Sequence, residues 1–374
     1  MKTLKYVLVN IVGTLLRFLP WSYPGGLLEI GQPDDSSPVL MTCNYRLTVE
    51  RVLRSLMGMD AHLLVANSDG VNVWCAATGG RLTSHDVISV LKTSGIEERV
   101  SHRSVVLPQL AATGVEAGVV ESKSGWQVIW GPVYAQDLPR FLREGQDEGR
   151  TMRMVRFPLG QRVEMATAYA FPLSLLVGVV TALWWRHAFV PSVVAVWGLC
   201  LAVYLTFPAY RSWPGPAGKG SGVVLAGLVA SWAVAMVCAA GYSFVVAGAE
   251  WGGIARWGVL TLVVLVVLGI DLLGSTPVYK SGLHEDRRLR VELDLAKCHG
   301  AGACVEVCPR DCYELDQGRG KVSMPGSIRC VQCGACIVQC PCDALSFATP
   351  DGGTITPETV RRFKLNLMGS RVEE

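Results

Sequence analysis

A run of four cysteines near the C-terminus constrains this chain more than any other feature. Its spacing is Cys330-x2-Cys333-x2-Cys336-x3-Cys340, followed at once by Pro341. This spacing is typical of thiolates that bind a cubane iron–sulfur cluster. Nine of the 13 cysteines lie between Cys298 and Cys342. Such clustering favours thiolates on iron in a reducing compartment over disulfides or zinc. We therefore predict a small iron–sulfur domain over residues 290–348.

An earlier run of cysteines predicts that this domain has the α+β fold of a bacterial two-cluster ferredoxin. In such ferredoxins the last cysteine of each run binds the cluster of the other run. One complete [4Fe-4S] site is then expected from Cys308, Cys330, Cys333 and Cys336. The other site keeps Cys298, Cys304 and Cys340, because Ala301 stands where another cysteine is expected. Three thiolates suit a [3Fe-4S] cluster, or a [4Fe-4S] cluster whose last iron is bound by Cys312 or a non-cysteine group. The alternative is an empty, purely structural site.

Residues 23–150 have the pattern of an α/β domain. Short apolar runs predict strands at 38–42, 62–66, 105–107 and 126–130. Helical periodicity and caps predict helices over 47–57, 84–91 and 136–144. This alternation favours a layered fold with a mostly parallel sheet. Ligands of such folds bind at the carboxyl ends of the strands.

About a hundred strongly apolar residues separate the two domains. Hydrophobic residues make up 50% of the chain and charged residues 17%. Uncharged runs at 166–185, 188–207 and 222–248, with a weaker one at 257–274 that contains Asp271, predict an all-α transmembrane bundle of about four helices in the region 166–275. Residues 1–22 are interpreted as an interfacial amphipathic helix. Residues 151–165 and 276–289 are expected to be linkers, and 349–374 a tail.

The expected location follows from the thiols and the charges. Iron–sulfur ligands need reduced cysteines, so both soluble domains are expected in the cytoplasm. Arg153, Arg156 and Arg162 precede the first apolar run, in agreement with the positive-inside rule. We therefore expect a multi-pass protein of the cytoplasmic (inner) membrane, with the lipid bilayer as a partner. A net charge of +3 without a basic run argues against nucleic acid.

Cys75 is the second candidate for chemistry. It stands in Asn72-Val73-Trp74-Cys75-Ala76-Ala77, just after a predicted strand. The two alanines would let a bulky ligand lie close to the backbone. The alternative is that Cys75, like Cys43, is a buried small hydrophobic residue. Neither a phosphate-binding glycine loop nor a Ser-His-Asp arrangement is evident in the sequence.

Several segments of the N-terminal domain resemble the corrinoid protein of bacterial mercury methylation. They are Ser37-Pro38-Val39-Leu40, Thr42-x-Asn44-Tyr45, Asn72 to Ala77, Ser101-His102-Arg103, Leu107-Pro108-Gln109-Leu110 and Gly125-Trp126-x-Val128. The wider relatives are the corrinoid iron–sulfur protein subunits of acetyl-CoA synthase/decarbonylase complexes. The mercury family also has C-terminal membrane spans, and its partner is a separate two-cluster ferredoxin. This chain resembles the two partners fused end to end.

The resemblance implies a Rossmann-like domain that holds a cobalamin-type corrinoid in its crevice. Cys75 would be the catalytic residue and the lower axial thiolate on cobalt. The other implied corrinoid contacts are Thr42, Asn44, Asn72, Val73, Trp74, Ala76, Ala77, His102, Pro108 and Gln109. A donating thiolate favours delivery of a methyl group to a soft electrophile such as Hg(II), and low-potential clusters can re-reduce cobalt. The implied partners are a folate-linked methyl-donor methyltransferase and an upstream low-potential electron donor.

Three departures from the family keep other functions open. Thr78-Gly79-Gly80-Arg81 stands where the family has Gly-Lys-Gly, and Ala301 replaces a cluster ligand. The chain ends at Glu374 without the family's terminal cysteine pair. The leading interpretation is a membrane-anchored, corrinoid-dependent methyltransferase that forms methylmercury. The alternatives are a corrinoid methyl carrier with a non-mercury acceptor, or a membrane-bound iron–sulfur electron-transfer protein without corrinoid.

Overall fold

The protein divides into two compact units. The computed structural model describes residues 2–145, 149–210, 232–233, 235–238, 241, 251–274, 289–365 and 371–373. One unit comprises Met1–Gly13, Leu19–Val155 and Glu285–Glu374, and it contains both an α/β domain and the cysteine-rich domain. The other comprises Thr14–Phe18 and Arg156–His284, and it is helical where it is described.

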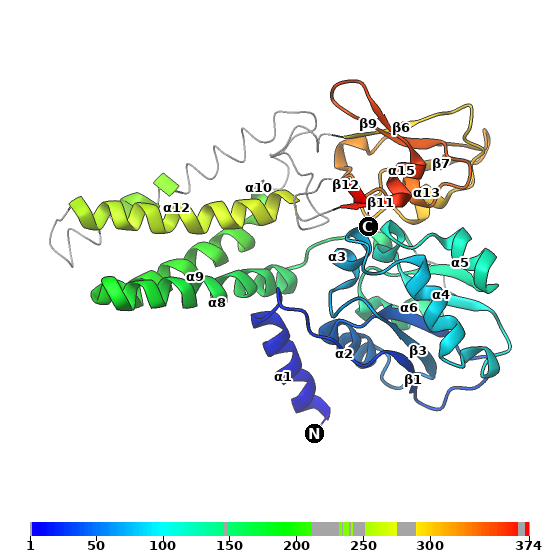
Figure 1. The fold of residues 1–374 in the computed structure, drawn as a ribbon, viewed down its shortest axis with the longest axis horizontal. Helices are drawn as coiled ribbons and strands as arrows, with labels where there is room; N and C mark the ends of the chain where they lie inside the picture. Colours follow the sequence, from blue (N-terminus) through cyan, green and yellow to red (C-terminus); the bar gives the residue numbers. More distant parts are fainter. Residues whose placement is uncertain are drawn as a thin grey trace. The chain divides into compact units, whose positions relative to one another are not determined.

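The α/β domain is built on a five-stranded sheet in the order β1-β3-β2-β4-β5. Its strands β1 and β3 are labelled in Figure 1. The strands are β1 (Gly26–Ile30), β2 (Val39–Cys43), β3 (Ala61–Ala66), β4 (Ser104–Pro108) and β5 (Gln127–Gly131). β2, β3, β4 and β5 run parallel to one another, as the sequence predicts. β1 was not predicted, and it pairs antiparallel with β3 at the edge of the sheet.

Helices cover both faces of this sheet. The helices are α2 (Arg46–Ser55), α3 (Val73–Thr78), α4 (Ser84–Thr93), α5 (Ala117–Ser124), α6 (Leu138–Arg143) and α7 (Arg150–Arg153), with short 3-10 turns η1 (Ile96–Glu98), η2 (Gln109–Thr113) and η3 (Ala135–Asp137). On β3, Leu64 packs in the core shared with α3, α4 and η2, whereas Leu63 packs in the core shared with α2 and α6. The strands are therefore buried on both faces, which explains why they read as unbroken apolar runs.

The ends of this domain differ from the predicted boundaries. The N-terminal helix α1 (Lys2–Leu15) forms as expected, and its Lys5 lies 2.9 Å from Glu50 of α2. The predicted linker 151–165 is partly structured, because Met152 of α7 is fully buried in the core with α2 and α6. That side chain belongs to the α/β domain rather than to a free linker.

The cysteine-rich domain shows the internal repeat that the sequence predicts. Its elements are β6 (Arg290–Leu293), α13 (Ala303–Glu306), β7 (Glu314–Asp316), β8 (Lys321–Ser323), η6 (Ser327–Arg329), α14 (Ala335–Val338) and β9 (Leu345–Ala348). The short helices α13 and α14 each follow a glycine with positive φ, Gly302 at 79° and Gly334 at 80°. Each helix then carries a cysteine in its first turn, which places Cys304 and Cys336 at equivalent points of the repeat.

The segment after residue 348 is not a plain tail. It forms β10 (Thr354–Ile355), α15 (Pro357–Arg362), β11 (Phe363–Leu365) and β12 (Arg371–Glu373). Val360 is 2% exposed within the core of the cysteine-rich domain. Arg361 donates to the carbonyl oxygens of Val338 and Cys340, which ties α15 to the second cysteine run.

The second unit contains long apolar helices. They are α8 (Leu159–Trp184), α9 (Phe189–Leu205, preceded by η4, Arg186–Ala188) and α12 (Trp251–Gly274), with the short α10 (Phe207–Tyr210). In the described part of the chain, three helices are long and apolar enough to cross a membrane. They correspond to three of the four predicted spans, whereas most of the predicted span 222–248 lies outside the described residues. Leu176 and Leu183 of α8 are more than half exposed.

Candidate functional site

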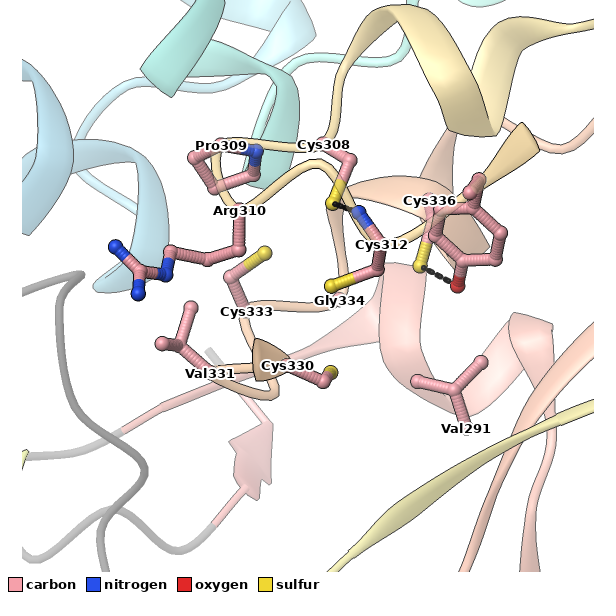
Figure 2. Close-up of a pocket in the computed structure, with 11 residues that line it drawn as sticks. Val291, Cys308, Pro309, Arg310, Cys312, Cys330, Val331, Cys333, Gly334 and Cys336 are labelled. Carbon is pink, nitrogen blue, oxygen red and sulfur yellow. Dashed lines mark hydrogen bonds between the residues drawn. The ribbon is translucent and has the colours of Figure 1, made fainter. Parts of the chain in front are cut away.

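Five cysteines line one pocket in the cysteine-rich domain. Figure 2 shows the side chains around a space of about 310 Å³, part of which is open to solvent. The thiols come from both cysteine runs and are Cys308, Cys312, Cys330, Cys333 and Cys336. Four of them are the set that the spacing assigns to one [4Fe-4S] cluster. An all-sulfur donor set drawn from two runs fits a cubane cluster. Among the described residues, no three metal-binding side chains converge on a point suited to a single metal ion.

Cys312 corrects one expectation. We proposed it as a substitute ligand for the incomplete site of Cys298, Cys304 and Cys340. The structure instead places it in the other pocket, where its backbone N–H donates to Cys308 Sγ over 3.3 Å. The internal repeat explains this position, because the N–H of Ala344 donates in the same way to Cys340 Sγ over 3.4 Å. Cys312 is therefore a fifth thiol at the complete site.

Hydrogen bonds prepare the thiols of the complete site for negative charge. The Tyr313 hydroxyl donates to Cys336 Sγ over 3.1 Å, and the N–H of Gln332 donates to Cys330 Sγ over 3.4 Å. A side-chain hydrogen bond from Cys312, assisted by its backbone N–H, lowers the pKa of Cys308 to about 7. Burial raises the pKa of Cys333 to about 12. Most of these thiols therefore need a positive partner to ionise, and iron supplies one.

The incomplete site is also formed by neighbouring buried thiols. Cys298, Cys304 and Cys340 are each less than 9% exposed. Burial, followed by the charges of Cys340 and Cys298, raises the pKa of Cys304 to about 12. Cys342 lies beside this group, with its Sγ 3.6 Å from Cys340 Sγ. The structure thus gathers the three predicted ligands and adds a neighbouring thiol.

Cys75 lies in the first turn of α3, after the carboxyl end of β3. Asn72 is the residue before the helix, and its Oδ1 accepts a hydrogen bond from the Cys75 N–H over 3.1 Å. This cap fixes the start of a helix only six residues long. The Cys75 side chain is exposed, whereas Cys43 of β2 is fully buried. Burial raises the pKa of Cys43, so that thiol stays neutral.

The two alanines after Cys75 do not have the role expected of them. Ala76 and Ala77 are both fully buried, so neither presents its side chain at the exposed face of α3 that carries Cys75. A β-carbon placed on Gly114, just after η2, would lie 2.4 Å from the Ala77 carbonyl oxygen. The small residues therefore allow α3 and η2 to approach each other. Val73, at 8% exposure, faces the same core, whereas Trp74 is half-buried.

Thr42 and Asn44 have mainly structural surroundings. Thr42 is buried in β2, and strand alternation turns it to the opposite face from Cys43. Asn44 Oδ1 accepts hydrogen bonds from the Ser68 N–H, the Ser68 hydroxyl and the Gly70 N–H. Asn44 thereby fixes the loop that leads from β3 to α3, and with it the position of Cys75.

His102 does not join this group. It precedes β4, and its Nε2 lies 3.0 Å from the carbonyl oxygen of Ser37, which precedes β2. Both strands run parallel, so His102 lies at their amino ends while Cys75 follows the carboxyl end of β3. A five-residue strand separates these edges by about 16 Å. His102 therefore lies at the opposite edge of the sheet from Cys75.

Three other residues that the resemblance singled out have structural positions or partners in the same unit. Pro108 ends β4 and leads into η2. Gln109 is 1% exposed, and its Nε2 donates to the Glu306 carbonyl oxygen over 3.2 Å. Its Oε1 is a buried acceptor without a hydrogen-bond partner among the described residues. Arg81, near the position of the family's lysine, pairs with Asp69 at 3.7 Å.

Two residues beside the predicted cluster ligands could not be singled out from the sequence. Tyr313 follows Cys312 without any spacing signal, yet it donates to a predicted cluster ligand. Gln339 stands between Cys336 and Cys340, and its amide bonds to the α/β domain rather than to its own domain. No pattern in the sequence identifies a side chain that bonds to a backbone over 200 residues away.

Comparisons with known proteins agree with this division into domains. Residues 18–142 match the family described as CO dehydrogenase/acetyl-CoA synthase delta subunit, and residues 290–347 match a 4Fe-4S dicluster domain. The acetyl-CoA decarbonylase/synthase complex subunit gamma of Methanopyrus kandleri is 38% identical over 127 residues, which cover 33% of this chain and 27% of the relative. The subunit of Methanothermobacter thermautotrophicus is 36% identical over 125 residues (33% and 27%), and that of Archaeoglobus fulgidus 37% over 121 residues (32% and 25%).

These matches cover a part of each protein. The chain spans about a quarter of the length of the curated relatives that it matches. The match coincides with the α/β domain that carries Cys75, and the second family match coincides with the domain that carries the clustered cysteines. The α/β domain is therefore homologous to acetyl-CoA decarbonylase/synthase gamma subunits, and it is joined in one chain to a 4Fe-4S dicluster domain.

Proposed function

We propose that this chain is a membrane-anchored, corrinoid-dependent methyl carrier with its own ferredoxin. The observation that carries the proposal is the exposed thiol of Cys75. It lies at the carboxyl edge of a mostly parallel sheet, in the domain that is similar to acetyl-CoA decarbonylase/synthase gamma subunits. Ligands of such folds bind at this edge. The dicluster domain belongs to the same compact unit, so an electron source accompanies the thiol.

The residues around Cys75 fit a corrinoid that is held through its metal. A thiolate is the kind of donor that soft metals prefer, and Cys75 is the exposed cysteine of this domain. Asn72 caps α3 and holds the Cys75 backbone, and Asn44 holds the preceding loop. These two residues would orient the thiol. A bound corrinoid supplies a metal centre that accepts a methyl group and passes it to an acceptor.

The cysteine-rich domain would supply electrons to this centre. Cys308, Cys330, Cys333 and Cys336 would hold a [4Fe-4S] cluster, and Cys298, Cys304 and Cys340 a second cluster of three or four irons. Iron–sulfur clusters of this class supply single electrons at low potential. An upstream low-potential one-electron donor would re-reduce them, and a folate-linked methyltransferase would supply the methyl group.

Three helices support the membrane part of the proposal. α8, α9 and α12 each contain an uncharged or nearly uncharged stretch long enough to span a bilayer. Both flanking domains carry thiols that must stay reduced, so we place them in the cytoplasm and the helices in the inner membrane. The bilayer is then the anchor that keeps the two domains at the membrane surface.

Hg(II) is the acceptor that we propose first. The segment Asn72 to Ala77 resembles the motif of the mercury-methylating corrinoid protein, and a corrinoid held by the donating thiolate of Cys75 would supply a methyl group suited to a soft metal ion. A second acceptor follows from the comparisons, because the relatives are subunits of acetyl-CoA decarbonylase/synthase complexes. In that case the methyl group would pass to a partner protein of that class.

The test compares two cysteines of one domain. Full-length protein, Cys75→Ala and Cys43→Ala are loaded with corrinoid without oxygen, and bound cobalt, its visible spectrum and methylmercury formation are measured. We expect Cys75→Ala to lose the thiolate-bound spectrum and all product, and Cys43→Ala to keep both. Equal spectra and product in the wild type and Cys75→Ala would refute the role of the thiol. Methylated wild type that yields no methylmercury would favour the second acceptor.

A further inference from the structure

The cysteine-rich domain contacts the α/β domain through the amide of one glutamine. Gln339 Nε2 donates to the carbonyl oxygens of Ala112 and Val115 over 2.8 and 2.6 Å. Gln339 Oε1 accepts from the Ala117 N–H over 3.2 Å. Ala117 is the first residue of α5, so its N–H has no acceptor within the helix. One side chain therefore satisfies three backbone groups where η2 ends and α5 begins.

A second glutamine bonds in the opposite direction. Gln109, at the start of η2, donates to the Glu306 carbonyl oxygen at the end of α13. Val307 and Ala335, from the two halves of the internal repeat, are buried in the same apolar core as α3, α4 and η2. Buried apolar contact with reciprocal hydrogen bonds is the construction of a fixed interface rather than of a passing encounter.

An ion pair continues the same surface. Arg361 of α15 lies 3.5 Å from Glu116, the residue before α5. The same guanidinium donates to the Cys340 carbonyl oxygen. Gln339 and Arg361 thus both bind the segment that joins η2 to α5. Gln339 precedes Cys340 in the chain, and Arg361 bonds to the Cys340 carbonyl oxygen.

The opposite side of η2 packs against the helix that carries Cys75. η2 contacts α3, and it also contacts α14, which carries Cys336. Gly114 makes the first approach possible, since any β-carbon there would collide with the Ala77 backbone. η2 is therefore the shared layer between the thiol helix and a cluster helix.

We propose that the ferredoxin domain is docked on η2 and α5, not merely tethered, and that Gln339 is the positioning residue of this dock. The functional consequence rests on the proposed function. One electron would leave a reduced cluster, which is oxidised by one unit, and reduce the metal held by Cys75 by one unit. An external low-potential one-electron donor would then restore the cluster. A fixed dock keeps the distance constant for every transfer.

The test uses one isosteric substitution at two glutamines of the same domain. Gln339→Glu keeps the shape of the side chain, but it replaces the donor to Ala112 and Val115 with an anionic oxygen. Gln317→Glu makes the same change at an exposed position in the turn between β7 and β8. Amide hydrogen exchange of segment 112–117 is measured on the full-length protein without corrinoid. Exchange of the Ala117 amide reports the dock directly.

The expected result is at least a tenfold faster exchange at Ala117 in Gln339→Glu and unchanged exchange in Gln317→Glu. With corrinoid and reduced clusters, the first-order rate of metal reduction should fall at least tenfold in Gln339→Glu alone, while the EPR spectra of the clusters stay the same. Wild-type exchange in Gln339→Glu would overturn the dock. Faster exchange with an unchanged reduction rate would overturn its role in electron delivery. The exchange result holds even if the domain binds no corrinoid, so the two proposals fail separately.

Discussion

Gly114→Ala should destabilise the α/β domain because there is no room for a methyl group. The new β-carbon would lie 2.4 Å from the Ala77 carbonyl oxygen, 2.7 Å from that of Leu82 and 2.9 Å from Ala77 Cα. All three atoms belong to the backbone, so relief requires α3 to move away from η2. Overpacking of this kind costs about 1–3 kcal/mol. Removing glycine freedom from the unfolded chain returns about 0.4–1 kcal/mol. We expect a net loss of about 1 kcal/mol.

Gly118→Ala is a matched control four residues further along. No atom lies within 4 Å of a β-carbon at Gly118, which is inside α5. Its replacement should stabilise the domain by about 0.5–1 kcal/mol. The assay is urea unfolding of the full-length protein, followed by alkylation of Cys43, which is 0% exposed until the domain opens. With a slope of about 1–3 kcal/mol per molar urea, the urea midpoint of the Gly114 variant should fall by about 0.5 M.

The two variants must shift in opposite directions for this reasoning to hold. If Gly114→Ala unfolds with the wild-type midpoint, the contact between η2 and α3 is not as close as described, and the argument that small residues position Cys75 fails. If both variants are destabilised equally, the loss comes from glycine replacement in general and not from this contact.

Three further predictions test other parts of the site. Asn72→Ala removes the acceptor of the Cys75 N–H and should lower the free energy of unfolding by about 1 kcal/mol in the same alkylation assay. Asn72→Asp keeps an acceptor oxygen and should retain most of that stability. Tyr313→Phe removes a hydrogen bond to Cys336 Sγ, and such a bond favours the reduced, more negative cluster by about 0.5–1.5 kcal/mol. Its loss should lower the reduction potential of one cluster by about 20–65 mV in an EPR-monitored titration. Hydrogen bonds from Ser36 and Ser37 lower the pKa of Asp34 from its usual value of 3.8. The ionised carboxylate therefore stabilises the folded protein above about pH 3.8, and this stabilisation is lost as the pH falls through the lowered pKa. Asp34→Asn should therefore flatten the loss of stability below about pH 4 in acid unfolding; an unchanged acid profile would contradict this.

The strands of the α/β domain could be predicted from sequence because each is buried on both faces. β2 and β3 are buried throughout, so they appear as short apolar runs with loops at either end. β1 escaped prediction because it is an edge strand, and its residues are only partly buried apart from exposed Glu29. Its pairing with β3 depends on tertiary contacts that no local pattern encodes.

The cysteine sites could also be predicted from the sequence only in part. Spacing alone brought Cys308 together with Cys330, Cys333 and Cys336, because the internal repeat fixes which runs cross over. The spacing also shows that Cys312 matches Ala344 in the repeat, but it does not show which site each residue adjoins. The backbone hydrogen bonds from Cys312 to Cys308 and from Ala344 to Cys340 decide this point, and they form only in the tertiary structure.

The residues from Asn72 to Ala77 have two different roles that the sequence alone does not distinguish. Asn72 and Cys75 act at the start of α3, one as the cap and the other as the exposed thiol. Ala76 and Ala77 act on the buried side, where their size lets η2 approach. Resemblance to a corrinoid-binding motif therefore supports ligand contact only for the exposed part. Substitution of Ala77 by a larger residue should change stability before it changes metal binding, whereas substitution of Cys75 should do the reverse.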